Sequence, residues 1–199
     1  YTYNKISRML NHILCSLTKE ENKINDLEYI RILGFDSKGK EYLSKIKKLL
    51  YLLAVDGPVA PNVSQLAADI QTSRATVMNY IKYLEDARLI NMVYPKGEQF
   101  PKKPSKVVMH NSNLMYSFYP VKVNEQDVLD TFFMNTMYKD HKLYKGDKGT
   151  SFLVDEGLHF RICPEGCIFK NNPHVYYAMH KQELGHGNQI PLWLFGFLY

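Results

Sequence analysis

Residues 62–95 read "NVSQLAADIQTSRATVMNYIKYLEDARLINMVYP" and give the clearest indication of how the surrounding chain folds. Its first part repeats apolar residues at helical spacing, and Asn62 or Ser64 can cap that helix. After the short turn "QTS", Ser73 is placed to cap a second helix. The second helix has one apolar stripe, formed by Val77, Ile81 and Leu84. The stretch therefore predicts two short helices joined by a tight turn.

The residues that follow predict a β-hairpin. "LINMVYP" (89–95) alternates like a strand, "KGEQFPKKPS" (96–105) is a loop rich in lysine and proline, and "KVVMHN" (106–111) returns as a strand. Two helices with a tight turn, followed by a hairpin, are typical of a winged helix-turn-helix. We therefore predict this fold over residues 42–112, with the hairpin loop as the wing.

Upstream of this unit the pattern is helical. A helix is expected over residues 40–55, ended by "DGP", and apolar residues repeat at helical spacing over residues 3–17. "GFDSKGKE" (34–41) is close to a phosphate-binding loop, but Glu41 stands where such a loop needs a serine or threonine to bind magnesium. We therefore expect a helical extension over residues 1–41 and no ATP site in it.

Downstream of Asn113 the pattern changes again. A helix is expected from Gln126 to about Tyr138, and the short strands "SFLVD", "LHFRIC" and "VYYAMH" follow it with glycine and proline between them. This order of elements predicts a small α/β domain over residues 113–199, so that the whole chain is α+β.

The amino-acid composition indicates where in the cell the protein is located and whether it holds a metal site. The three cysteines among 199 residues are too few for a disulfide framework and suit a reducing cytoplasm. Cys163 and Cys167 enclose "PEG" with His159 and His174 nearby, but they lack the paired spacing of a zinc site. No apolar run is long enough to span a bilayer. We therefore expect a cytoplasmic protein without a membrane partner, and no metal site.

Five stretches carry a resemblance to a known family. They are "KIKKLLYLLAVDGPVAPNVSQLAADIQTSRATVMNYIKYLEDARLINMVYPKG", "NSNLMYSF", "DTFFMN", "FLVDEGLHFRI" and "GNQIPLWLFGFLY". From about Tyr42 onward the chain resembles the C-terminal part of a family of predicted bacterial AAA+ ATPases. In that family an ATPase module precedes a winged helix and a domain similar to PD-(D/E)xK nucleases. The resemblance implies that ATP and magnesium bind upstream of Tyr1, and that residues 1–41 are a remnant of the ATPase module.

The resemblance also implies nuclease-like positions in the last domain. Such nucleases hold magnesium between an acid on a helix, an aspartate at a strand end and a glutamate on the next strand, with a lysine beyond it. On this sequence these places fall at Asp130, Asp155, Arg161 and Glu165. Arginine has no lone pair for a metal, and a turn at "EGL" would let Arg161 pair with Asp155. We therefore expect a degenerate restriction-endonuclease-like domain without catalytic residues.

The basic residues of the expected winged helix are the candidate contacts to nucleic acid. If the unit binds DNA, the helix from Ser73 would enter the major groove and the wing would reach phosphates. The candidate DNA-binding residues are Arg74, Thr76, Asn79, Lys82, Lys96, Lys102, Lys103 and Lys106. Winged helices also contact proteins, and Asp69, Glu85 and Asp86 reduce the positive charge here. Double-stranded DNA and a protein therefore both stay open as partners.

The function expected from these observations is that of a non-catalytic C-terminal region of an AAA+ ATPase, which contacts DNA or a protein through its winged helix. Two alternatives remain, a metal-dependent nuclease and a pure protein scaffold. We do not expect this part of the protein to be an enzyme or to hold a cofactor. The sequence leaves the client, the DNA sequence and the oligomeric state open.

Overall fold

The computed structural model describes residues 37–118, 123–147, 149–168 and 172–198. The helix expected over residues 3–17, and most of the expected extension, lie outside these ranges. The division of the chain into residues 1–41, 42–112 and 113–199 stays a prediction, although helix α3 runs across the first of its boundaries.

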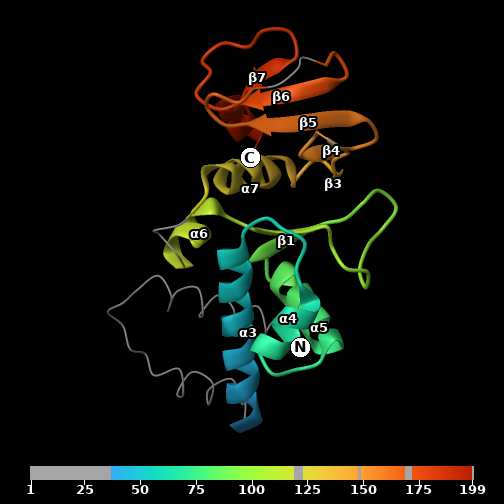
Figure 1. Ribbon diagram of the computed structural model, residues 1–199, viewed down its shortest axis with the longest axis vertical. Coiled ribbons are helices and arrows are strands. Elements are labelled where there is room, and N and C mark those ends of the chain that lie inside the picture. Colours follow the sequence, from blue (N-terminus) through green and yellow to red (C-terminus); the bar gives the residue numbers. More distant parts are fainter. Residues whose placement is uncertain (1–36, 119–122, 148, 169–171, 199) are drawn as a thin grey trace.

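The first part of the fold, here called the helical lobe, contains the segment that opened the sequence analysis. Its elements are α3 (Ser37–Asp56), α4 (Val63–Asp69), α5 (Arg74–Asp86), β1 (Ile90–Val93) and β2 (Lys106–Met109). In Figure 1 the long helix α3 stands beside α4 and α5, and the hairpin lies at their upper end. The three helices bury a common apolar core, which includes Leu49, Ile81 and Leu84.

The helix starts follow from capping side chains. The Asn62 side chain accepts a hydrogen bond from the Gln65 amide at 3.2 Å, so Asn62 rather than Ser64 caps α4. Ser73 Oγ accepts from the Thr76 amide at 3.1 Å and caps α5. Such caps satisfy backbone N–H groups that the first helical turn leaves unpaired. The tight turn between α4 and α5 is therefore fixed by local chemistry.

The second part, here called the sheet lobe, is one mixed sheet covered by a helix. Its elements are α7 (Glu125–Met137), β3 (Leu143–Lys145), β4 (Phe152–Val154), β5 (Leu158–Cys163), β6 (Val175–Met179), β7 (Gln189–Pro191) and the 3-10 helix η1 (Leu192–Leu198). The connecting helix α6 (Ser112–Phe118) packs Leu114 and Met115 into the core of the helical lobe. The strand order is β3-β4-β5-β6-β7; the first two pairings are antiparallel and the last two are parallel. Figure 1 shows α7 crossing below this sheet, between it and the hairpin.

Aromatic rings fill the space between α7 and the sheet. Phe133 of α7 is fully buried, and its ring centroid lies 5.6 Å from that of Phe152, 5.1 Å from Phe160 and 4.9 Å from Phe195. These partners come from β4, β5 and η1. One side chain of the covering helix therefore connects two central strands and the C-terminal segment.

The hairpin β1–β2 is buried on both faces. Met92 pairs with Val107, and both belong to the core of the helical lobe. The alternate residues Val93 and Val108 belong to the core of the sheet lobe. Because successive side chains of a strand point to opposite faces, one hairpin can serve as a wall for two cores. The two lobes are therefore packed against each other through the hairpin.

The assignment to named folds stays a prediction. The structure is a mixture of helices and two sheets, and helix α7 starts one residue before the helix expected from Gln126. Neither the winged helix-turn-helix nor the nuclease-like domain is tested by these elements alone. None of the helices in the described ranges is both long and apolar enough to cross a lipid bilayer.

Three buried or partly buried polar side chains at the hairpin, His110, Asn91 and Asn135, lead to a prediction on the pH dependence of stability. His110 Nδ1 lies 3.3 Å from Asn91 Oδ1, and the Asn91 amide donates to Asn135 Oδ1 at 3.1 Å. Burial lowers the pKa of His110, and the positive charge of Arg88 lowers it further. The unfolded chain binds this proton near pH ~6.5, whereas the folded state binds it only at lower pH. Stability should therefore fall as the pH drops from about 6.5 through the lowered pKa.

The measurement is urea unfolding of the wild type and of His110→Gln at closely spaced pH values from about 5 to 8. The variant should lose much of the acid-side decline, while His174→Gln, a change at an exposed position, should keep it. An unchanged decline in His110→Gln would contradict the assignment of the proton to His110.

Candidate functional site

Helix α5 is the expected recognition helix. Some of its predicted DNA-binding residues are exposed, whereas others form contacts within the helix itself. Arg74 and Asn79 are exposed. Thr76 belongs to the helix cap, since its hydroxyl lies 2.8 Å from Ser73 Oγ. Lys82 forms ion pairs within α5, at 2.9 Å to Glu85 and 3.0 Å to Asp86. Arg74 and Asn79 are therefore the predicted residues of this helix that remain available to a ligand.

The Lys82 ion pairs also determine its protonation. Burial of the side chain acts to lower the Lys82 pKa, but the hydrogen bonds and charges of Glu85 and Asp86 outweigh burial and raise it. The ammonium group is thus firmly charged and neutralised by its own helix. A phosphate would have to compete with two carboxylates for it, so a leading role for Lys82 in nucleic-acid binding is disfavoured.

The hairpin loop, residues 94–105, carries exposed lysines as expected. Lys102 forms an ion pair with Glu98 at 3.0 Å. Lys96 Nζ lies 3.4 Å from the Glu156 backbone oxygen, at the turn between β4 and β5. Lys103 forms no ion pair with any residue in the described part of the chain. These three amines extend from a loop whose base is buried between two cores.

The loop lies beside a second lysine-bearing segment that sequence reasoning missed. Tyr94 forms a parallel β-bridge with Tyr144 of β3. The Lys145 backbone amide donates to the Tyr94 backbone oxygen at 2.8 Å. Lys142 and Lys145 are exposed. The regular spacing of lysine in "KDHKLYK" (139–145) was a signal in the sequence. Its position beside the hairpin loop depends on tertiary pairing.

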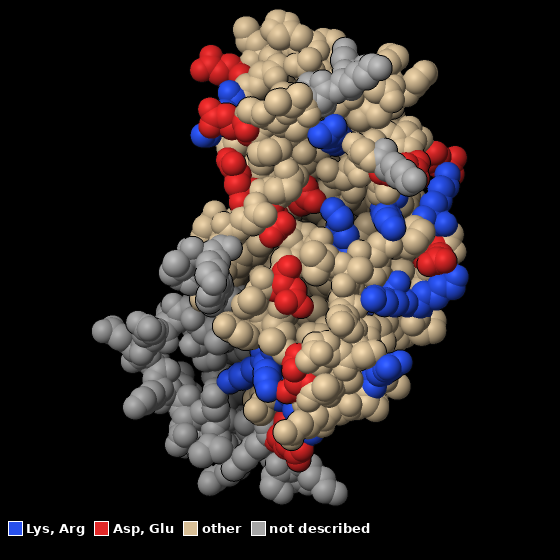
Figure 2. Space-filling view, viewed as in Figure 1, with Lys and Arg blue, Asp and Glu red and all other residues tan. Residues whose placement is uncertain are grey.

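We call the exposed amines of these two segments the basic edge. Its residues are Lys96, Lys102, Lys103, Lys142 and Lys145. Figure 2 shows blue side chains grouped on the right of the molecule, over the hairpin loop and the neighbouring strands, whereas red side chains are more frequent on the left. Amines spread along one edge can neutralise successive phosphates of a nucleic acid.

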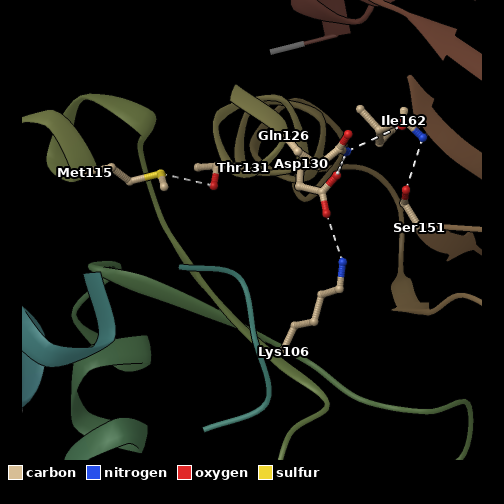
Figure 3. Close-up of polar contacts among 7 residues, drawn as sticks. All are labelled: Lys106, Met115, Gln126, Asp130, Thr131, Ser151 and Ile162. Carbon is tan, nitrogen blue, oxygen red and sulfur yellow. Dashed lines mark hydrogen bonds and ion pairs between the residues drawn. The ribbon is translucent and has the colours of Figure 1, made fainter. Parts of the chain in front are cut away.

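Lys106 does not belong to this edge. Its Nζ lies 2.9 Å from Asp130 Oδ2 on α7, and 4.9 Å from the centre of the Phe152 ring (Figure 3). The Asp130 side chain is 8% exposed and that of Lys106 is 25% exposed. The predicted role of Lys106 as a phosphate contact is therefore disfavoured, because the amine is engaged inside the junction between the lobes.

A small hydrogen-bond network surrounds this ion pair (Figure 3). Gln126, one turn before Asp130 on α7, donates through Nε2 to Asp130 Oδ1 at 2.8 Å and lies 3.4 Å from the Ile162 oxygen. The Ile162 amide donates to Ser151 Oγ at 3.1 Å. Both oxygens of Asp130 thus have partners from the protein. The network joins α7 to β5 on one side and to β2 on the other.

The hairpin β4–β5 differs from the turn expected at "EGL". The turn consists of residues 155–157, with Val154 opposite Leu158. Asp155 itself has a left-handed φ of 53°. Its carboxylate accepts the Lys142 amide at 2.9 Å and lies 2.8 Å from His141 Nδ1. The backbone hydrogen bond from Lys142 and the contact with His141 lower the Asp155 pKa.

The expected pair between Arg161 and Asp155 is therefore wrong. Arg161 Nη2 instead lies 3.8 Å from Cys167 Sγ. Glu165 forms an ion pair with Lys181, which lowers the Glu165 pKa. Asp130, Asp155, Arg161 and Glu165 thus each have a different partner and do not converge on one site. Within the described ranges, no group of three or more histidine, cysteine, aspartate or glutamate side chains is placed to hold a metal ion.

A cavity of about 400 Å³ opens between α7 and the C-terminal segment. Its lining residues are Ser112, Val128, Leu129, Phe132, His180, Lys181, Leu192 and Trp193. The wall is mostly apolar, and its two titratable residues already have partners: Glu125 lies 3.4 Å from His180, and Lys181 pairs with Glu165. The cavity therefore offers apolar surface and few unoccupied polar groups.

Comparison with known proteins gives a consistent set of relatives. A family model described as HIGH Nucleotidyl Transferase matches residues 1–88. The chain is 32% identical over 131 residues to the tRNA(Met) cytidine acetate ligase of Bacillus cytotoxicus, covering 64% of this chain and 28% of that protein. It is 38% identical over 74 residues to the ligase of Lysinibacillus sphaericus, covering 37% of this chain and 18% of the relative. The ligase of Caldicellulosiruptor saccharolyticus is 34% identical over 88 residues, with 42% and 22% covered.

The chain thus spans about a quarter of the length of the curated relatives that it matches. No solved structure matches it at a significant level.

These findings correct the expected relationship. The resemblance to AAA+ ATPases is wrong as an identification, since residues 1–88 match the nucleotidyltransferase model and the relatives are ligases. The match also includes residues 1–41, which had been interpreted as a remnant of an ATPase module.

The expected function is corrected with it. The predicted non-catalytic region of an ATPase, the nuclease alternative and the scaffold alternative disagree with relatives that are nucleotidyltransferases and ligases. The prediction that this chain is no enzyme is wrong on the same ground, because the similar proteins are enzymes. A nucleic-acid partner stays a prediction.

Proposed function

We propose that this chain is part of an enzyme of the tRNA(Met) cytidine acetate ligase type, and that its basic edge binds the phosphate backbone of the tRNA substrate. The observation that carries the first part is the similarity of 131 residues, 64% of the chain, to such a ligase. The match of residues 1–88 to a nucleotidyltransferase family supports the same class of reaction.

The second part of the proposal is supported by the charge of the chain and the position of its amines. The formal net charge is +5, and five exposed lysines lie along the hairpin loop and along the segment 142–145, which contains β3. RNA helices are recognised largely through shape and through phosphate and sugar contacts, because their deep major groove is closed to side chains. Amines at a fixed spacing suit this kind of recognition better than a helix designed to read bases.

The spacing of the basic edge is fixed by the fold. The hairpin loop is held at its base by two buried cores, and the Tyr94–Tyr144 bridge joins it to β3. The backbone segments that carry these lysines are therefore joined to each other. A preorganised set of charges loses less conformational entropy on binding than lysines on independent loops.

Binding of a fluorescent tRNA(Met) transcript, measured by anisotropy across a salt series, tests the proposal. Each neutralised phosphate releases condensed counterions, so five contacts should give a log–log slope of about −4. Lys102→Glu/Lys103→Glu should weaken binding and make the slope shallower by roughly 2. The reason is that two amines of the edge are lost and two repulsive charges are added.

Lys181→Glu is the matched control. Lys181, like Lys102, is an exposed lysine paired with a glutamate, but it lies after β6 in the sheet lobe. It should leave the affinity and the slope unchanged. Equal loss in the control and the double variant would refute the basic edge as the binding surface. Equal affinity for a DNA duplex of the same length would refute the assignment of tRNA as the partner.

A further inference from the structure

The loop after β5 brings two cysteines together. Cys163 is the last residue of β5 and is fully buried, whereas Cys167 is partly exposed. Between them the chain turns back: the Cys167 amide donates to the Pro164 oxygen at 3.2 Å, and Gly166 has a φ of +70°. The two thiols are free. Arg161 and Cys163 lie on one face of β5 and Arg161 contacts Cys167, so the loop brings Cys167 over the face that carries Cys163.

The surroundings of the two thiols differ. Arg161, two residues before Cys163 on the same face of β5, places Nη2 3.8 Å from Cys167 Sγ. The guanidinium is therefore placed to donate a hydrogen bond at this sulfur. Burial raises the pKa of Cys163 to about 12, and the neighbouring Cys167 raises it as well. The exposed sulfur is thus suited to react first, and the buried thiol is held beside it.

We propose that Cys163 and Cys167 form an oxidation site, at which a hydroperoxide converts the two thiols into a reversible intramolecular disulfide. The division of roles follows from exposure: Cys167 meets the oxidant, and Cys163 resolves the product. This proposal is independent of the function proposed above, since it concerns a loop at the other end of β5 from the basic edge.

The chemistry balances with hydrogen peroxide as the oxidant. The Cys167 thiolate attacks one peroxide oxygen, the O–O bond breaks, and the departing hydroxide takes a proton to become water. Cys167 is then a sulfenic acid. The Cys163 sulfur attacks the Cys167 sulfur, the S–S bond forms, and the S–O bond breaks as hydroxide leaves with the Cys163 proton. Two thiols and one peroxide give one disulfide and two waters, and two electrons pass from sulfur to oxygen.

The test uses the full chain with Cys15→Ser, so that only this pair can react. The protein is treated with hydrogen peroxide, free thiols are alkylated, and peptides are mapped by mass spectrometry without reduction. We expect one peptide in which Cys163 and Cys167 are joined by an internal disulfide, a monomeric protein, and recovery of both thiols with dithiothreitol. In Cys163→Ser, the sulfenic acid at Cys167 should persist and be trapped by dimedone.

Two further variants separate the proposed roles. In Cys167→Ser, the buried Cys163 should resist peroxide under the conditions that oxidise the pair. Arg161→Gln should slow the oxidation several-fold, whereas Arg88→Gln, the same change at an exposed arginine elsewhere, should not. Rapid oxidation of Cys163 in Cys167→Ser would overturn the proposal. So would a product that contains sulfinic acid or intermolecular dimers in place of the internal disulfide.

Discussion

Replacing Lys106 with alanine is expected to lower the free energy of unfolding by about 3 kcal/mol. The substitution leaves the Asp130 carboxylate in the lobe junction without its ion-pair partner, and only the Gln126 amide still donates to it. A buried charge without its partner costs more than the intact pair contributes, because the desolvation penalty is no longer offset. Urea unfolding followed by circular dichroism gives the difference directly.

Two controls decide whether the ion pair is the cause. The double variant Lys106→Met/Asp130→Leu removes both charges and should recover much of the loss. Lys102→Ala removes an exposed lysine with a glutamate partner and should cost less than about 1 kcal/mol. A loss in Lys106→Ala no larger than that in Lys102→Ala would show that the junction does not depend on this pair.

Phe133→Ala is expected to cost about 3–5 kcal/mol, the largest effect of a single substitution in the sheet lobe. Phe133 is 0% exposed, and its ring contacts three other aromatic rings from β4, β5 and η1. The smaller side chain would leave a cavity among groups that cannot all move inward together. The measurement is again urea unfolding, with the near-ultraviolet circular dichroism as a report on aromatic packing.

The controls for this prediction vary volume and burial separately. Phe133→Leu keeps much of the volume and should cost clearly less than Phe133→Ala. Phe197→Ala removes a ring that is 79% exposed and should have little effect on stability. If Phe133→Ala were no more destabilising than Phe197→Ala, the ring cluster would not be the main support of α7.

Local signals predicted the helices of the helical lobe well. Asn62 and Ser73 cap α4 and α5, and Val77, Ile81 and Leu84 are buried in one stripe. These features depend on residues a few positions apart, which the sequence displays directly. The turn after β4 was harder. A shift of one residue, from "EGL" to "DEG", placed Asp155 in the turn and removed it from the face of Arg161.

Long-range pairing could not be predicted in the same way. By residue type, Lys106 suited a phosphate contact and Asp130 suited a metal ligand. In the structure the two side chains bind each other, although they are 24 residues apart in the sequence. Lys142 and Lys145 belong to the basic edge only because the bridge between Tyr94 and Tyr144 places their segment beside the hairpin loop. Composition and residue spacing could not predict the class of enzyme either. Short similar stretches indicated one family, whereas the match of residues 1–88 indicates another.

The hairpin with two buried faces has a consequence for how the protein comes apart. Cutting the chain after Met109 or Ser112 would leave Val93 and Val108 facing water, together with the polar groups of Asn91 and Lys106 that now find partners on α7. Neither half would then have a complete core of its own. The two lobes are accordingly expected to melt in one cooperative transition.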